Sequence, residues 1–69
     1  MKTDDFKTWD RVIYVPSHAD GNLNHKDCEY GIVKSVNERF VFVLYIKNNI
    51  PQMVASATKP VDLILDARS

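Results

Sequence analysis

The chain has 69 residues, nine of them Lys or Arg and nine Asp or Glu, so its formal net charge is zero. This length allows one small domain and excludes a second hydrophobic core. The composition, 45% hydrophobic and 26% charged, is typical of a folded domain rather than of a disordered tail. Zero net charge disfavours duplex nucleic acid as a partner, because that partner usually requires a basic surface.

The distribution of apolar residues and cysteine favours a cytoplasmic protein. No apolar run approaches the roughly 18–20 residues that cross a bilayer, and residues 1–5 lead into no apolar segment typical of a signal peptide. Cys28 is the single cysteine and cannot form an internal disulfide, whereas small secreted domains usually carry several. We therefore expect neither secretion nor membrane binding.

In chain order, the sequence predicts short strands separated by turns. Their β-branched and aromatic content places five strands over residues 11–15, 31–36, 40–46, 53–57 and 63–65. Residues 31–46 are expected to form a hairpin around a turn at 37–39. Residues 47–52 read as a loop, because Asn tolerates the left-handed conformation and Pro51 cannot donate a hydrogen bond.

The N-terminal segment permits two interpretations. A short helical turn capped by Thr3, Asp4 or Asp5 would place Phe6 and Trp9 on one side, at a spacing of three residues. A frayed terminus that packs Trp9 against the domain fits the sequence equally well.

The segment Ser17–Glu29 is polar and is expected to be a long loop. Asp20-Gly21 predicts a turn. Asn24 and Asp27 have the spacing of a capping box, which would start one helical turn over His25–Cys28. Thirteen residues make a long loop for a small domain, and such loops are often functional.

This layout favours an all-β fold: a small five-stranded SH3-like barrel with one long loop after the first strand. Closing the sheet into a barrel would hide edges that an open sheet exposes. The whole chain, 1–69, would form this single domain, with its core at about residues 9–65. The chain leaves no room for the helix of an OB-fold. A three-stranded sheet with a helix is also disfavoured, because no segment has the 3.6-residue period of a helix packed on a sheet.

The order of strands and loop also resembles the KOW and Tudor branch of SH3-like barrels. More closely, the segment Asp10–Gly31 resembles small proteins encoded by bacteriophages and prophages, with further counterparts at 36–43 and 57–63. Those proteins mostly have no assigned activity, so the resemblance implies a fold and a phage or prophage origin. The chain departs from them at Trp9, where a Gly often stands, and at Leu44, where a charged residue often follows Val-Phe-Val.

The long loop gathers the side chains that bind metals or act as nucleophiles. His18, His25 and Cys28 are the candidate zinc ligands, with Asp20, Asp27 or Glu29 as a fourth, but their spacing matches no standard zinc motif. The sequence favours a loop whose side chains bond its own backbone, and hence no metal and no cofactor.

A catalytic role for Cys28 with a histidine base would need an oxyanion hole and an orienting group, and neither is identifiable. A domain of this size also leaves little room for a cleft of about 300 Å³. We therefore expect no enzymatic activity.

The strand at 40–46 is apolar on both sides, and only one side can face the core. The expected core consists of Val12, Tyr14, Val33, Val41, Val43 and Leu63. Phe40, Phe42 and Leu44 would then face outward and form either a contact site or a surface covered by the Phe6–Trp9 segment or the Met53 loop.

These observations favour a non-enzymatic protein-interaction module of phage or prophage origin. Its partner would be a host factor or a second copy of the chain, in a homodimer. The expected partner-binding residues are Phe40, Phe42, Leu44, Trp9, His18 and His25. The alternative is a nucleic-acid-binding domain of the KOW type that uses the same aromatic residues with Lys34, Arg39 and Lys47. The acidic residues of the loop at 17–29 would repel phosphate and disfavour it.

Overall fold

The computed structural model describes residues 2–66 and shows an all-β fold, as the sequence predicts. The strands are β1 (Arg11–Tyr14), β2 (Glu29–Val36), β3 (Val41–Lys47), β4 (Ile50–Pro51), β5 (Ser56–Thr58) and β6 (Leu63–Leu65). Three short 3₁₀ turns join them: η1 (Thr3–Asp5), η2 (Ser17–Ala19) and η3 (Pro60–Asp62). Within residues 2–66 there is no α-helix.

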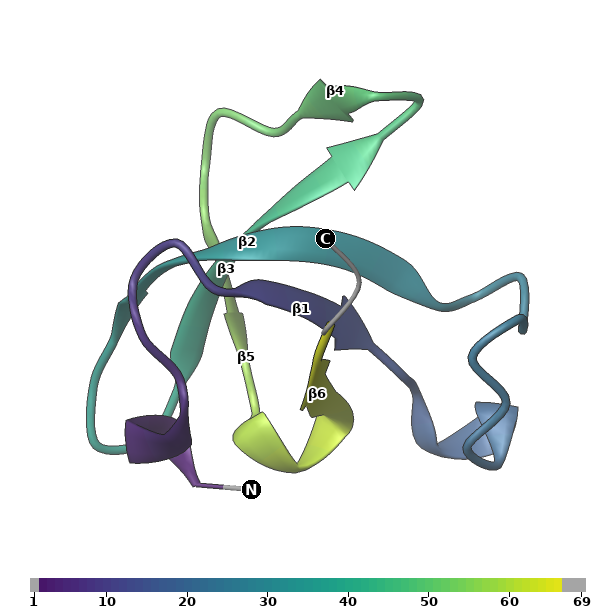
Figure 1. Cartoon of the computed structure of the whole chain (residues 1–69), viewed down its shortest axis with the longest axis horizontal. Coiled ribbons are helices and arrows are strands. Elements are labelled where there is room, and N and C mark those ends of the chain that lie inside the picture. Colours follow the sequence, from purple (N-terminus) through teal and green to yellow (C-terminus); the bar gives the residue numbers. More distant parts are fainter. Residues whose placement is uncertain (1, 67–69) are drawn as a thin grey trace.

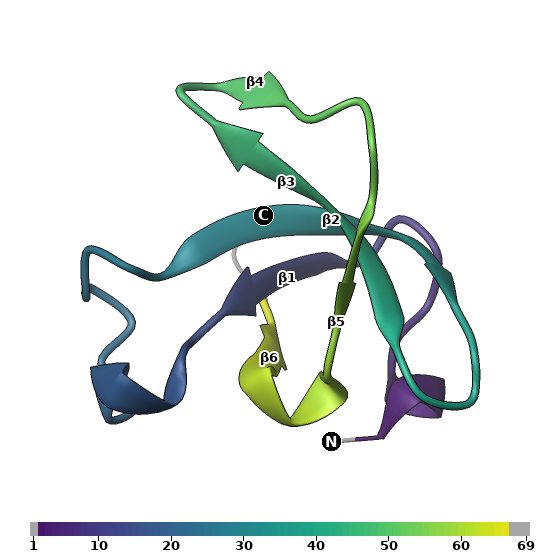
Figure 2. The same ribbon diagram turned by 180° about the vertical axis from the view of Figure 1, so that it is seen from behind.

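All strand pairs are antiparallel and belong to one sheet with the order β4-β3-β2-β1-β6, in which β5 also pairs with β3. β4 and the end of β3 stand away from the rest of the sheet (Figure 1). Seen from behind, β5 and β6 lie next to each other and are joined by η3 (Figure 2). The sheet is thus six-stranded and is not closed into the expected five-stranded barrel.

The additional strand, β4, lies in the segment that was expected to be a loop. Asn48 and Asn49 have φ angles of 53° and 65°, and Lys47 pairs with Ile50 on either side of them. Positive φ at both residues of a two-residue connection is the type I′ turn, which joins antiparallel strands. The left-handed tolerance of Asn therefore makes a hairpin here, and the next strand begins at Ser56 rather than at Met53.

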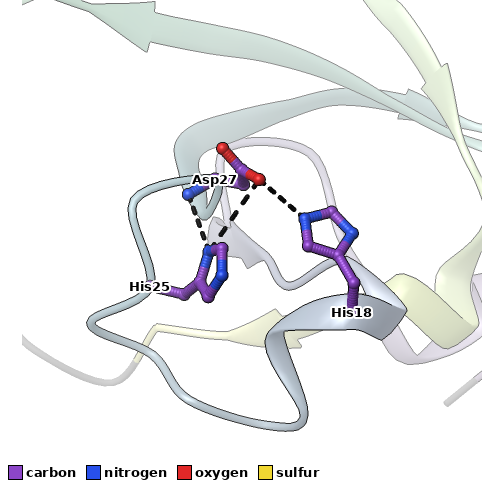
Figure 3. A group of neighbouring side chains, drawn as sticks. All are labelled: His18, His25 and Asp27. Carbon is purple, nitrogen blue, oxygen red and sulfur yellow. Dashed lines mark hydrogen bonds and ion pairs between the residues drawn. The ribbon is translucent and has the colours of Figure 1, made fainter.

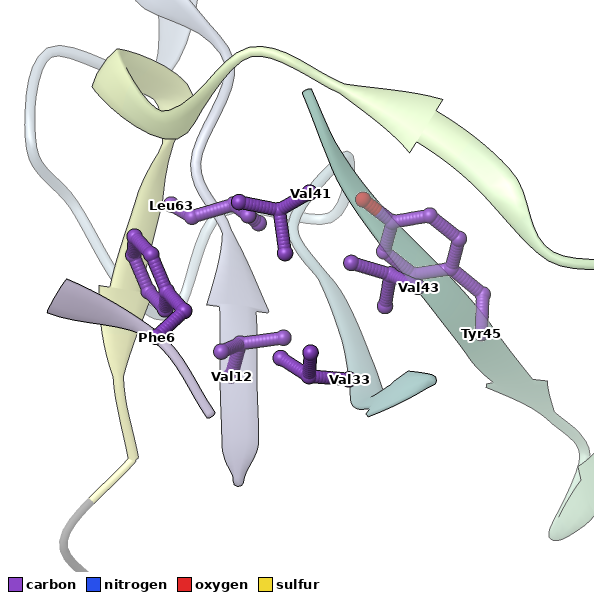
Figure 4. Close-up of a cluster of buried hydrophobic side chains, with 7 residues drawn as sticks. All are labelled: Phe6, Val12, Val33, Val41, Val43, Tyr45 and Leu63. Carbon is purple, nitrogen blue, oxygen red and sulfur yellow. The ribbon is translucent and has the colours of Figure 1, made fainter. Parts of the chain in front are cut away.

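Most of the core lies on one side of the sheet and forms one cluster (Figure 4). The buried residues of this cluster are Phe6, Val12, Val33, Val41, Val43, Tyr45 and Leu63. Ile13 and Ala19 are also buried but do not belong to this cluster. Five of the six predicted core residues are buried as expected, whereas Tyr14 is only partly buried and packs against the cluster. Its ring makes an edge-on contact with Tyr45, with centroids 6.2 Å apart.

The N-terminal segment contributes Phe6 to this core, so the sheet alone does not complete it. A 3₁₀ turn forms, but η1 consists of the residues that were expected to cap it, Thr3–Asp5, and its N-cap is Lys2. Phe6 is 2% exposed and Trp9 is 76% exposed. The two rings therefore do not share one environment. Packing of Trp9 against the domain, the other interpretation, is wrong for its side chain.

The loop after β1 follows a series of tight turns. η2 is followed by Asp20 and Gly21, with φ angles of 53° and 75°, which confirms a turn at this dipeptide. Over His25–Cys28 the chain makes a single turn, closed by the Cys28 amide donating to the His25 carbonyl at 3.0 Å, rather than a helix. Another turn of the loop is closed by the amide of Asn24 donating to the side-chain oxygen of Asn22.

Candidate functional site

The outer face of the β2–β3 hairpin is apolar. Side chains on β3 alternate, so Val41, Val43 and Tyr45 point into the core while the residues between them point away from it. Ile32 on β2 lies directly opposite Leu44. We define the outer face by its four apolar residues, which are all partly buried: Ile32, Phe42, Leu44 and Ile46.

Phe42 and Leu44 lie on this face as the sequence predicts, but Phe40 does not extend the row. β3 begins at Val41, and Phe40 instead closes the preceding turn. Both the amide of Phe40 and that of Arg39 donate to the side-chain oxygen of Asn37, each at 2.8 Å. All three expected residues, Phe40, Phe42 and Leu44, are partly buried rather than fully exposed.

The Phe6 ring and the side chains of Met53 and Val54 do not cover the outer face. Phe6 belongs to the core cluster, which lies on the opposite side of the sheet from Phe42 and Leu44. The side chains of Met53 and Val54 are 98% and 77% exposed. A cover by the Phe6 ring or by these two side chains is therefore excluded.

Exposed apolar side chains also gather on the part of the chain that follows β3, which sequence reasoning did not single out. Ile50, Met53 and Val54 all have more than two thirds of their surface exposed, and β4 stands away from the rest of the sheet (Figure 1). The sequence feature that indicates this surface is the run Ile-Pro-Gln-Met-Val at 50–54. Its apolar residues do not follow the periodicity expected of a buried strand.

Trp9 is the most exposed aromatic side chain among residues 2–66. It occupies the third position of a turn in which the Asp10 amide donates to the Lys7 carbonyl at 3.0 Å. Its φ angle is 77°, a left-handed value that favours glycine. The Trp9 amide donates to the Val33 carbonyl at 2.8 Å, so the turn is fixed to β2 at Val33.

The histidines of the long loop converge on one carboxylate (Figure 3). His18 Nε2 lies 2.7 Å from Asp27 Oδ2, and His25 Nδ1 lies 4.0 Å from the same oxygen. The imidazole rings are in edge-on contact, with centroids 5.3 Å apart. The hydrogen bond from His18 lowers the pKa of Asp27 below its ordinary value.

Cys28, the third expected ligand, does not belong to this group. Its thiol donates to the Asn22 carbonyl at 3.3 Å, and Asp27 takes the place that the sequence interpretation gave to the cysteine. The loop also satisfies part of its own backbone, as expected. The Asp27 amide donates to His25 Nδ1 at 3.0 Å, and the Cys28 amide donates to the His25 carbonyl.

A hollow with a volume of about 480 Å³ lies between β1, β3, β5 and η3. It is lined by Tyr14, Phe40 and Tyr45 together with charged residues, among them Glu29 and Lys47, which form an ion pair at 3.5 Å. This volume exceeds that of the cleft of about 300 Å³ for which the length of the chain was expected to leave little room. Pairing with Glu29 also engages Lys47, one of the three cations that the nucleic-acid interpretation needs.

Comparison with protein-family models, with curated proteins and with solved structures found no match to this chain. Over residues 2–66, no helix is long and apolar enough to cross a membrane.

Proposed function

We propose that this protein is a non-enzymatic interaction module that binds a protein partner through the outer face of its β2–β3 hairpin. The observation that carries this proposal is the apolar character of both sides of β3. One side fills the core, and the other presents Phe42, Leu44 and Ile46 away from it. Adjacent apolar side chains on an outer face usually mark a contact surface.

The strand order supports an SH3-like architecture within this proposal. β6, β1, β2, β3 and β5 are neighbours in that order, a long loop follows β1, and a 3₁₀ turn separates β5 from β6. The resemblance of residues 10–31 to small phage and prophage proteins gives the setting: the cytoplasm of a bacterial host. The partner is then a host factor or a second copy of the chain.

Charge and exposure are compatible with association. The formal net charge of zero leaves little repulsion between two copies near neutral pH. The exposed ring of Trp9, in a turn bonded to Val33 of β2, is an aromatic group of the kind enriched in protein interfaces. A nucleophilic role for Cys28 finds no support, because its thiol contacts a backbone carbonyl and not a histidine.

The test is a double variant, Phe42→Ser with Leu44→Lys, examined by sedimentation. Wild-type protein should sediment as a dimer or as a complex with a partner recovered from host lysate, and the variant should sediment at the chain mass of 7.9 kDa. The variant should remain folded, because neither residue belongs to the core cluster. A matched control, Leu23→Lys with Val61→Ser, changes two exposed apolar residues elsewhere and should leave association intact.

Two results would contradict the proposal. One is a wild-type protein that is monomeric at high concentration and recovers no partner. The other is loss of association in the Leu23 and Val61 control but not in the outer-face variant. A mobility shift of nucleic acid that weakens steeply with salt would instead favour a KOW-type nucleic-acid-binding domain.

A further inference from the structure

The loop between β1 and β2 brings together the donor atoms of a metal site. Among residues 2–66, His18, His25 and Asp27 form a group whose ligand atoms all lie within 4.8 Å of one another. The residues come from two ends of the loop, since His18 lies in η2 and Asp27 lies just before β2. The turns of this loop therefore place two imidazoles and a carboxylate around a common point (Figure 3).

The hydrogen bonds of the group indicate which nitrogen of His25 is free of a proton. The Asp27 backbone N–H donates to His25 Nδ1 at 3.0 Å, so this nitrogen presents a lone pair. A metal-binding imidazole must be neutral, with its lone pair on the coordinating nitrogen. His25 Nδ1 already meets that condition and is 4.0 Å from the Asp27 carboxylate oxygen.

The distances fit a small ion after modest movements of side chains. Ligand atoms held about 2.0–2.1 Å from a tetrahedral ion are about 3.3 Å apart. The His18 nitrogen and the Asp27 oxygen, now 2.7 Å apart, would separate slightly, whereas the His25 nitrogen and the same oxygen would approach each other. The side chains of His18, His25 and Asp27 are 61%, 27% and 48% exposed, which leaves room for this adjustment and for entry of an ion.

We propose that His18, His25 and Asp27 form a binding site for a divalent transition-metal ion of the Zn²⁺ class. Two imidazole nitrogens and one carboxylate oxygen suit such ions, whereas Mg²⁺ and Ca²⁺ prefer oxygen ligands throughout. Three protein ligands leave a fourth position of a tetrahedral ion for water or for a side chain of a partner. This site goes beyond the proposed function, because it shares no residue with the outer face.

Binding replaces interactions that the metal-free loop makes. The ion takes the lone pair of His25 Nδ1, and water then accepts the Asp27 amide proton, which is possible in an exposed loop. It also replaces the contact between His18 and Asp27. A proton on Nε2 of a neutral His18 ring passes to Nδ1 through solvent, so that Nε2 presents its lone pair to the ion. The thiol of Cys28 keeps its bond to the Asn22 carbonyl and is not required.

The test is calorimetric titration of the chelator-treated 69-residue chain with Zn²⁺, followed by the same titration of His18→Ala, His25→Ala and Asp27→Asn. Wild type should bind about one equivalent of Zn²⁺, and each substitution should weaken binding roughly tenfold or more. The matched control is Asp20→Asn, which removes another exposed carboxylate of the same loop and suits its left-handed φ of 53°. Asp20→Asn and Cys28→Ser should bind Zn²⁺ as tightly as wild type does. Wild type should not bind Mg²⁺.

Imidazole ¹⁵N resonances give a second readout that does not depend on affinity. Zn²⁺ should shift the coordinating nitrogens of His18 and His25 together, at the same stoichiometry as the calorimetric transition. The proposal is overturned if wild type binds no stoichiometric Zn²⁺, or if the His18 and His25 variants bind it as wild type does. Association measured in chelator tests the outer face separately, so failure of one proposal is distinguishable from failure of the other.

Discussion

The phenolic oxygen of Tyr45 on β3 lies 2.7 Å from Oγ1 of Thr58 on β5, inside the molecule. Thr58 is the one buried polar residue among the described residues, and this bond satisfies it. Burial raises the pKa of Tyr45 above its ordinary value of 10.0, against the opposing effect of the hydrogen bond with Thr58. The nearby carboxylates of Glu29 and Asp62 raise it further.

This arrangement predicts a loss of stability in alkali that depends on Tyr45. Because the folded-state pKa is raised, the contribution is fully present below about pH 10 and disappears as pH rises through the folded-state pKa. Urea unfolding of wild type between about pH 8 and pH 11 should show this decline. Tyr45→Phe should reduce the decline and cost about 1 kcal/mol at neutral pH through loss of the hydrogen bond.

Tyr30→Phe is the matched control, since this ring lies 38% exposed on β2. The bond between Tyr45 and Thr58 is intact in this variant, so Tyr30→Phe should keep the alkaline decline that Tyr45 causes. A Tyr45→Phe protein with an undiminished decline would show that another group governs alkaline unfolding.

The side of β3 that faces the core could be predicted from the sequence, because alternation of side chains is a property of any strand. Val41 and Val43 are buried, Phe42 and Leu44 face away, and β6 spans Leu63–Leu65 as predicted. The contribution of Phe6 could not be predicted in this way, because it depends on where the N-terminal segment lies in space.

Two further differences between the structure and the sequence-based prediction lie in the β3–β4 connection and in the loop between β1 and β2. Asn48-Asn49 is compatible with a loop or with a type I′ hairpin, and only the pairing of Lys47 with Ile50 decides between them. Similarly, the sequence identifies His18 and His25 as possible ligands but offers Asp27 only as one of three carboxylates for a fourth position. Asp27 rather than Cys28 joins them because the successive turns of the loop determine which side chains meet.

Val43 provides a test of the core and of the register of β3. Its side chain is fully buried. In the sheet, Val43 pairs with Val33 on β2 and with Ser56 on β5. Val43→Ala should lower the free energy of unfolding by roughly 1–3 kcal/mol, because it removes two buried methyl groups and leaves a cavity. Denaturant unfolding measures this directly.

Val54→Ala makes the same chemical change at a side chain that is 77% exposed. It should alter stability by less than about 0.5 kcal/mol. Equal effects of the two substitutions would indicate that β3 is shifted by one residue, since such a shift turns every side chain to the other face.

Replacing Trp9 should give an unusual result, because removal of a large aromatic side chain is expected to stabilise the protein. Its φ of 77° is costly for any residue with a Cβ atom, and its ring, 76% exposed, contributes little burial in return. Trp9→Gly relieves this backbone strain, at the cost of greater freedom in the unfolded chain. We expect the free energy of unfolding to rise by roughly 0.5–1 kcal/mol.

Trp9→Ala separates the backbone effect from the effect of the ring, because alanine removes the ring but keeps the strain. Its stability should lie about 1 kcal/mol below that of Trp9→Gly and close to that of wild type. If both variants are destabilised equally, the ring stabilises the fold and the strain is negligible. If Trp9 also contacts the partner, both variants should weaken association while Trp9→Gly melts at the higher temperature. Retention of a strained, exposed tryptophan would then be explained by binding rather than by folding.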